Sequence, residues 1–257
     1  MIGAIAGDII GSVYEHNRIK TKDFPLFSPR SRFTDDTVLT VAVAHSILTG
    51  VTYKDAIKNI GKRYPYAGYG GTFIQWLLSE DGGPYNSWGN GSAMRVSPVG
   101  FAFNSTDEVL KQARMTAEIS HNHPEGIRGA QATALTVYMA RQGKNKEEIR
   151  RCIKEQFKYD LDRSVNEIRG VYAFDISCQG TVPEAIISFL DSDSYEDAIR
   201  NAISLGGDSD TLACITGGIA EAYYGPVPND IRAEVEGILP PDLMAVTKAF
   251  YEKFIDR

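Results

Sequence analysis

Apolar residues recur along most of the chain with the spacing of amphipathic or buried helices, while the alternation typical of β-strands is scarce. Several of these helical stretches are followed by a stop signal, as at Gly50, Gly143 and Gly225. The pattern therefore predicts an all-α fold. The expected helices cover residues 37–48, 107–118, 125–142, 183–190, 195–204, 210–223 and 242–255.

Segments rich in glycine and proline separate these helices. The longest are 61–71 (GKRYPYAGYGG) and 81–100 (DGGPYNSWGNGSAMRVSPVG), which we expect to be loops. Long ordered loops in a helical domain often bind ligands. No low-complexity tract or linker interrupts the 257 residues, a length that one hydrophobic core can organise. We therefore expect a single domain over residues 1–257.

The chain is mildly acidic, with 27 Lys and Arg against 33 Asp and Glu and a formal net charge of −6. Because no block or stripe of basic residues offsets this charge, a general nucleic-acid or anionic-membrane surface is not expected. A membrane span is not expected either, because no stretch approaches about 18 uninterrupted apolar residues. The apolar segment 1–11 lacks a basic flank and carries Asp8, unlike a signal peptide. These features predict a cytoplasmic protein.

The cysteines, Cys152, Cys178 and Cys214, are odd in number, far apart and without a metal-ligand pattern. A disulfide framework or a zinc site is therefore not expected, and the chain is typical of a reducing compartment. None of the three has a neighbouring base in a recognisable pattern, so we expect all of them to be dispensable for chemistry.

Two short acidic motifs precede helices that are apolar on nearly every side. The first contains Thr34, Asp35 and Asp36; the second contains Asp208, Asp210 and Thr211. Helix capping explains either motif alone, because Asp and Thr are common N-cap residues. Helices that are apolar all round belong in the centre of a domain, however, so their acidic ends can meet. Such a cluster needs protons or cations, and its oxygen ligands suit Mg²⁺, Mn²⁺ or Ca²⁺.

A third element, residues 3–18 (GAIAGDIIGSVYEHNR), has small residues at helical spacing. Gly3, Gly7 and Gly11 permit a neighbouring helix to approach closely. Glu15 follows in a polar segment that we expect to leave the helix. From the residues alone, Glu15 reads as a solvated surface glutamate.

Together with three further motifs, these elements resemble the ADP-ribosylglycohydrolase family, which includes dinitrogenase reductase-activating glycohydrolase and the ADP-ribosyl-acceptor hydrolases. The matching segments occur in the family's order and span most of the chain, and the doubled Asp/Thr motifs are the specific part of the match. They are GAIAGDIIGSVYE (3–15), FTDDT (33–37), GNGSAMRVSPVG (89–100), SHNHPEG (120–126), CQGTVPEAI (178–186) and LGGDSDT (205–211).

The resemblance implies a single-domain orthogonal helical bundle around two divalent cations, Mg²⁺ or Mn²⁺, at the ends of central helices. The implied metal ligands are Thr34, Asp35, Asp36, Asp208, Asp210 and Thr211. The glutamate that matches Glu15 lies on a mobile segment over the site in the family, where it contacts a metal or the substrate ribose. Glu15 therefore joins the expected catalytic residues.

The resemblance also points to residues that hold the substrate. The glycine-rich loop 82–95 matches the segment that binds the diphosphate of ADP-ribose, and we select Ser87 and Gly89 there. Without the resemblance, this loop reads as a turn. His121 precedes a helix that starts near Pro124. The resemblance assigns it a hydrogen bond to bound ADP-ribose, with proton transfer as a secondary role.

The implied reaction is hydrolysis of the bond between the distal ribose of ADP-ribose and an acceptor on a protein or small molecule, with ADP-ribose as product. Two candidates for the base, Asp36 and Glu15, stay open. The main alternative is a catalytically silent ADP-ribose-binding or scaffold protein of the same fold, and a third is a two-metal phosphoesterase. Arginine, serine, a nucleic-acid base and a metabolite all remain candidate acceptors, so nucleic acid is expected only as an ADP-ribosylated substrate.

Overall fold

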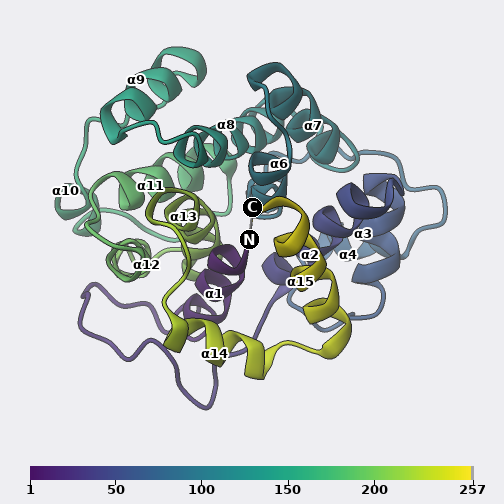
Figure 1. Ribbon diagram of the computed structural model, residues 1–257, viewed down its shortest axis with the longest axis horizontal. Helices are drawn as coiled ribbons and strands as arrows, with labels where there is room; N and C mark the ends of the chain where they lie inside the picture. The colour runs from purple at the N-terminus through teal and green to yellow at the C-terminus, as the bar shows by residue number, and fades with distance from the viewer. Residues whose placement is uncertain (256–257) are drawn as a thin grey trace.

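In the computed structural model, which describes residues 1–255, the chain forms helices and no strand, with only an isolated bridge between Gly89 and Ser177 (Figure 1). The predicted all-α fold is therefore confirmed. The helices are α1 (Ile2–Gly11), α2 (Asp35–Thr49), α3 (Tyr53–Gly61), α4 (Gly71–Leu78), α5 (Gly91–Met94), α6 (Ser97–Ala102), α7 (Thr106–Glu118), α8 (Pro124–Arg141), α9 (Lys146–Phe157), α10 (Val165–Arg169), α11 (Cys178–Leu190), α12 (Tyr195–Ser204), α13 (Ser209–Tyr224), α14 (Asn229–Ile238) and α15 (Pro241–Phe254).

All seven expected helices are present, six of them within two residues of the predicted bounds. The exception is α11, which begins at Cys178 rather than at residue 183. Its start is fixed by Ser177, whose side chain accepts a hydrogen bond from the N–H of Gly180. Pro183 lies inside the helix instead of marking its first turn.

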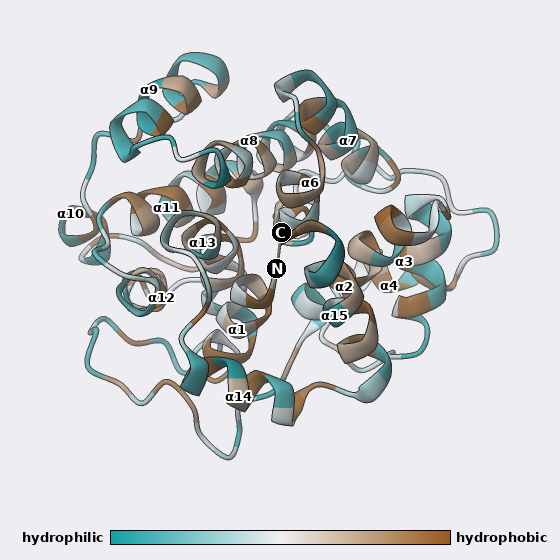
Figure 2. Ribbon diagram, in the orientation of Figure 1, coloured by the Kyte–Doolittle hydropathy of each residue, from teal (hydrophilic) through white to brown (hydrophobic). Residues whose placement is uncertain are grey.

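The expected loop 81–100 was wrong in its second half, where α5 and α6 form. Pro98 lies in the first turn of α6, a position that proline suits. The polar helix α9 was not predicted, because only Ile149, Ile153 and Phe157 are buried there. Figure 2 shows α9 at the edge of the fold with mostly hydrophilic residues. The sequence does mark its start with a capping box formed by Asn145 and Glu148.

The closest helix packing is between α1 and α13, which lie with α2 near the centre of Figure 1. A Cβ at Gly7 would collide with the carbonyl oxygen of Ala213, and one at Gly11 would lie 2.5 Å from the Cα of Asp210. Gly3 likewise faces Gly217. The two helices are therefore antiparallel, and the C-terminal end of α1 meets the N-terminal end of α13.

The buried apolar side chains form one continuous core that includes both central helices. α1 is buried over its whole length, and α13 is buried from Ser209 to Glu221. These helices therefore bring polar residues at their ends into the protein interior, which is where the site described below is found. None of the helices formed by residues 1–255 has both the length and the hydropathy needed to cross a bilayer.

Candidate active site

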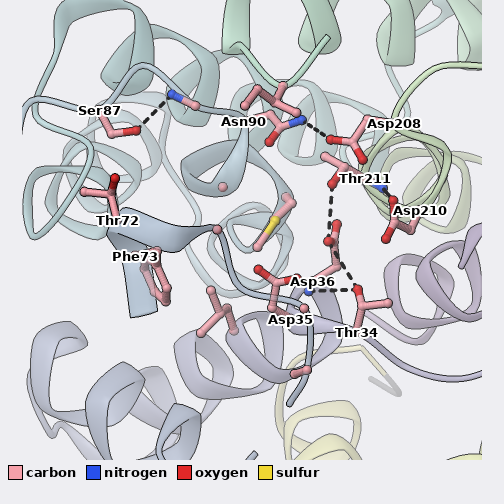
Figure 3. A pocket seen from close by; sticks show the side chains of 18 of the residues that line it. Thr34, Asp35, Asp36, Thr72, Phe73, Ser87, Asn90, Asp208, Asp210 and Thr211 are labelled. Atoms are coloured by element: carbon pink, nitrogen blue, oxygen red, sulfur yellow. Dashed lines mark hydrogen bonds between the residues drawn. The ribbon is translucent and has the colours of Figure 1, made fainter. Parts of the chain in front are cut away.

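A single cavity of about 610 Å³ is lined by every residue that the sequence placed in a site. Figure 3 shows the side chains of both acidic motifs on one side of it and those of Thr72, Phe73 and Ser87 on the other. The expected residues around the cavity are Glu15, Thr34, Asp35, Asp36, Ser87, Gly89, His121, Asp208, Asp210 and Thr211. The structure thus brings together segments from five parts of the chain.

The first acidic motif forms the N-terminus of α2. Thr34 is the N-cap, and its hydroxyl accepts a hydrogen bond from the N–H of Asp36 at 3.4 Å. The same hydroxyl donates to Asp8 Oδ1 at 2.6 Å. Capping and the clustering of carboxylates therefore occur together, so the two interpretations of this motif are compatible.

The second acidic motif forms the N-terminus of α13 and contacts the first directly. The Thr211 hydroxyl donates to Asp36 Oδ2 at 3.2 Å, as Figure 3 shows. Asp208 Oδ2 accepts a hydrogen bond from Asn90 Nδ2 at 2.7 Å. Asn90 thereby links the glycine loop to the carboxylates. The N-terminal ends of α2 and α13 do meet, as the metal interpretation of the sequence requires.

The carboxylates form two groups whose oxygens lie within 4.8 Å of one another. One group contains Asp8, Asp36 and Asp210, and the other contains Glu15, Asp208 and Asp210. Asp210 belongs to both groups and is the geometric link between them. Asp35 lines the cavity but belongs to neither group.

Burial and mutual repulsion make this cluster unfavourable as a set of bare carboxylates. Burial raises the pKa of Asp8 to about 6, although hydrogen bonds from Thr34 and Thr37 lower it. Burial, with the neighbouring Asp8 carboxylate, raises the pKa of Asp35 to about 8. The pKa values of Asp36 and Asp210 are raised well above the ordinary range by burial and neighbouring carboxylates.

The donor set fits hard divalent cations. Asp36 Oδ1 is buried and has no hydrogen-bond partner among residues 1–255, which leaves an anionic oxygen free to bind a cation. The surrounding ligands are carboxylate and hydroxyl oxygens, which Mg²⁺, Mn²⁺ and Ca²⁺ prefer. Cations would also neutralise the repulsion that raises the pKa values.

Glu15 lies beyond the end of α1, with a carboxylate oxygen within 4.8 Å of those of Asp208 and Asp210. Its side chain is 23% exposed, so it contacts both the cavity and solvent. The following segment is anchored by Lys20, whose Nζ donates to the carbonyl oxygens of Tyr172 at 2.6 Å and of Leu205 at 2.5 Å. The position of Glu15 is therefore fixed by the packing of α1 on α13 before it and by the Lys20 hydrogen bonds after it.

The glycine loop borders the opposite side of the cavity. The Gly89 N–H donates to Ser87 Oγ at 3.1 Å, and the Asn90 N–H donates to the carbonyl of Ile176 at 2.8 Å. The N–H of Gly89 is therefore already occupied by Ser87 within the loop itself. Gly82 and Gly83 do not line the cavity.

Of the two histidines before α8, His123 is the N-cap and accepts a hydrogen bond from the N–H of Glu125. His121 is buried and lines the cavity. Its ring lies between the rings of Phe73 and Tyr85, with centroid distances of 6.3 and 5.8 Å. The structure thus gives His123 a structural contact and leaves His121 facing the cavity.

Sequence reasoning missed Asp8 and Asn90 as members of the site. The signal for Asp8 was a single charge inside the otherwise apolar α1, which is fully buried. Asn90 carried no comparable signal, because asparagine is common in glycine-rich loops. Both residues act on the acidic cluster through hydrogen bonds.

Comparison with known proteins places this arrangement in a family. The chain is 28% identical to ADP-ribosylhydrolase ARH3 of Homo sapiens, covering 95% of this chain and 90% of that protein. It is 24% identical to ADP-ribosylarginine hydrolase Tri1 of Pseudomonas putida (strain GB-1), covering 88% and 69%.

A solved structure described as an ADP-ribosylglycohydrolase-related protein complex has the same fold. Its TM-score is 0.70 at 23% identity, with 98% of this chain and 95% of that chain covered. The family model for ADP-ribosylglycohydrolase matches residues 1–257. By this match over its whole length, with the expected residues around one cavity, the chain belongs to the ADP-ribosylglycohydrolase family.

Proposed function

We propose that this chain is a metal-dependent hydrolase that releases ADP-ribose from an ADP-ribosylated protein side chain or small molecule. The observation that carries the proposal is one cavity of about 610 Å³ that joins a buried carboxylate cluster to a glycine loop and aromatic rings. The family match and the names of the relatives, ADP-ribosylhydrolase and ADP-ribosylarginine hydrolase, support the substrate class.

Two divalent cations, Mg²⁺ or Mn²⁺, are the proposed cofactors. Asp36 and Asp210 would hold one ion, and Asp208 with Asp210 would hold the other. Thr34, Asp35 and Thr211 supply the remaining protein oxygens around the cluster. When bound, the cations supply positive charge that orients ribose hydroxyls and water and stabilises charge as the glycosidic bond breaks.

The same cavity has room for the rest of ADP-ribose. Phe73 and Tyr85 would offer ring faces or edges to the adenine side, and Ser87 and Gly89 border the path that the diphosphate would take to the acidic cluster. His121 lies beside this path. The distal ribose would then reach the carboxylates, and its acceptor would leave through the mouth near Glu15.

Glu15 is the better candidate for proton transfer. It combines partial exposure with a position in the carboxylate cluster, so it can exchange protons with water. Asp36 is only 2% exposed and receives the Thr211 hydroxyl hydrogen bond. We therefore assign Glu15 to proton transfer and Asp36 to metal binding, while the usual geometry of paired glycosidase carboxylates does not apply where metals hold the sugar.

The cysteines bear on the proposed location, and the cavity mouth bears on the choice of acceptor. The free thiols of Cys152, Cys178 and Cys214 support the proposed cytoplasmic location. Acceptor choice depends on groups around the cavity mouth, where Trp88 and Ile176 are exposed apolar residues. Protein side chains and small molecules are both proposed acceptor classes.

In the test, purified protein is incubated with Mg²⁺ or Mn²⁺ and a panel of defined ADP-ribosylated acceptors. The products are measured by mass spectrometry. Release of intact ADP-ribose from at least one acceptor is the expected result. Release of AMP would instead indicate a phosphoesterase. Binding of ADP-ribose without turnover of any acceptor would indicate a catalytically silent member of the fold.

A further inference from the structure

Arg95 is 0% exposed, yet its guanidinium makes no ionic contact with residues 1–255. Its Nη2 donates to the carbonyl of Thr116 at 2.6 Å and to Ser120 Oγ at 3.0 Å. Its Nε and Nη1 have no hydrogen-bond partner in the same part of the chain. Burial lowers the pKa of Arg95 only to about 10, so the side chain stays cationic at neutral pH. An unpaired buried charge is costly, so packing alone is a poor reason for this arginine.

The charge lies directly behind the wall of the cavity. The Arg95 Cζ is 5.9 Å from the centroid of the Phe73 ring, and Phe73 lines the cavity. Ser120, which receives the Arg95 hydrogen bond, is also 2.8 Å from Nδ1 of His121 through its Oγ. Arg95 thus reaches two residues of the cavity wall, one through its charge and one through Ser120.

These contacts fix the direction of the hydrogen bonds. A guanidinium only donates, so Ser120 Oγ accepts from Arg95. Among residues 1–255, the acceptor within reach of the Ser120 hydroxyl hydrogen is then Nδ1 of His121. With Nδ1 as acceptor, the proton of a neutral imidazole resides on Nε2. Burial and the Arg95 charge lower the pKa of His121 well below its ordinary value, which favours the neutral ring.

The Nε2 atom of His121 faces the glycine loop. A Cβ placed on Gly91 would lie 3.1 Å from Nε2, and one placed on Gly89 would lie 3.6 Å away. The Oγ of Ser87 lies 3.2 Å from the same Cβ position on Gly89. The Nε2 atom of His121 is therefore directed at the part of the cavity that the loop borders, and the Arg95 charge lies behind the neighbouring wall.

We propose that Arg95 and Ser120 are positioning residues that hold His121 as a neutral Nε2–H donor toward the glycine loop. Arg95 also supplies the positive charge that offsets an anion bound there. Under the function proposed above, on which this second part rests, that anion is the diphosphate of ADP-ribose. Arg95 does not itself line the cavity, so its charge acts on the anion across the wall formed by Phe73 and His121.

The first experiment observes the histidine tautomers in protein labelled with ¹⁵N-histidine, without any ligand. The wild type should show His121 protonated on Nε2, and Ser120→Ala should shift it toward a mixture of tautomers. His123, which accepts a hydrogen bond from the N–H of Glu125, is an internal reference that should not change. An Nδ1–H tautomer in the wild type, or an unchanged Nε2–H tautomer in Ser120→Ala, overturns the positioning role.

The second experiment compares binding of ADP-ribose with binding of adenosine, which has no phosphate, by NMR titration. Arg95→Met should weaken ADP-ribose binding roughly tenfold or more while leaving adenosine binding unchanged, because the buried positive charge that attracts the anion is lost. Arg95→Lys should retain most of the affinity. The matched control is Arg141→Met, since Arg141 is a partly buried arginine that also donates to backbone carbonyls, those of Phe101 and Phe103, but lies outside this cavity.

Equal losses for ADP-ribose and adenosine in Arg95→Met would overturn the anion role and show a packing role instead. If Arg95→Met does not fold, the same comparison in Ser120→Ala decides the matter, with selective weakening of ADP-ribose expected. Failure of the wild type to bind ADP-ribose overturns the proposed function. The tautomer experiment still decides the role of Ser120, because it uses no ligand.

Discussion

Asp8 and Thr34 are joined by two hydrogen bonds: the Thr34 N–H donates to Asp8 Oδ2 at 2.9 Å, and the Thr34 hydroxyl donates to Oδ1 at 2.6 Å. The N–H and hydroxyl of Thr37 also donate to Oδ2. Asp8 therefore ties α1 to the first turn of α2. Because Asp36 extends from that same turn, Asp8 fixes the position of a proposed metal ligand.

The substitution Asp8→Asn tests this tie. An amide keeps the size of the carboxylate but has only one acceptor oxygen, so donors from Thr34 or Thr37 lose their partner. We expect weaker binding of divalent cations and a loss of about 1–3 kcal/mol in the free energy of unfolding of the metal-loaded protein. Calorimetric Mn²⁺ titration and denaturant unfolding measure the two effects. Asp107→Asn, at an exposed position in α7, is the control and should change neither.

Divalent cations should stabilise the protein, and a chelator should remove both the stabilisation and the activity. At a concentration 100 times the dissociation constant, one bound cation adds about 2.7 kcal/mol to the free energy of unfolding. Asp210→Asn should weaken both ions together, because Asp210 belongs to both carboxylate groups. Full activity in the presence of chelator, with no heat of Mn²⁺ binding, would contradict the metal assignment.

The stability of the metal-free protein should fall as the pH rises from about 5 to about 8. Burial raises the folded-state pKa of Asp8 to about 6 and of Asp35 to about 8, while an unfolded Asp titrates near about 3.9. Over this range the folded state keeps protons that the unfolded state has released, so the free energy of unfolding decreases with pH. Thermal unfolding in chelator measures the slope. Saturating Mg²⁺ should reduce it, and an equal slope with and without Mg²⁺ would argue against cation binding by these groups.

The close packing of α1 on α13 gives a prediction about stability that is independent of metals. Gly7→Ala should destabilise the protein strongly, by roughly 1–3 kcal/mol or more, because the new Cβ collides with the Ala213 carbonyl. Gly237→Ala is the matched control, since Gly237 lies in α14 with no atom near its Cβ position. It should raise stability by about 0.5–1 kcal/mol. Denaturant unfolding compares the two, and similar effects would refute the packing argument.

The central part of this fold could be predicted because its sequence signals are local. Helices such as α8 and α13 have an apolar pattern long enough to read directly. The glycine spacing of α1 predicted close packing, although it did not identify α13 as the partner. The peripheral α9 was missed because three buried side chains in twelve residues give a weak apolar signal.

Some residues of the site could also be predicted from local sequence signals, and others could not. Residues in the doubled acidic motifs could be selected because like charges at the ends of apolar helices need an explanation. Asp8 and Arg95 could not be assigned, because their importance depends on contacts across the fold: Asp8 with Thr34, and Arg95 with Ser120. Spacing along the chain contains no information about such contacts. His121 was selected through the family resemblance, and its neighbours Phe73 and Tyr85 became visible only in the structure.

Glu15→Gln separates an enzyme from a binding protein. The amide should leave the fold and most of the proposed metal site intact, because the carboxylates of Asp36, Asp208 and Asp210 remain. If Glu15 transfers a proton or orients the ribose, turnover should fall by about 10²-fold or more while ADP-ribose affinity changes much less. Product release by mass spectrometry and calorimetric binding of ADP-ribose measure both quantities.

The control for this experiment is Glu118→Gln, on the surface of α7, which should behave as the wild type does. A catalytically silent protein would give a different pattern, with ADP-ribose binding in both forms and no turnover in either. Wild-type turnover by Glu15→Gln would transfer the proton role to Asp36. In that case Asp36→Asn should abolish turnover even at cation concentrations that fill the site. We expect the Asp36→Asn variant to lose its cations instead, because Asp36 is buried and its Oδ1 has no hydrogen-bond partner among residues 1–255.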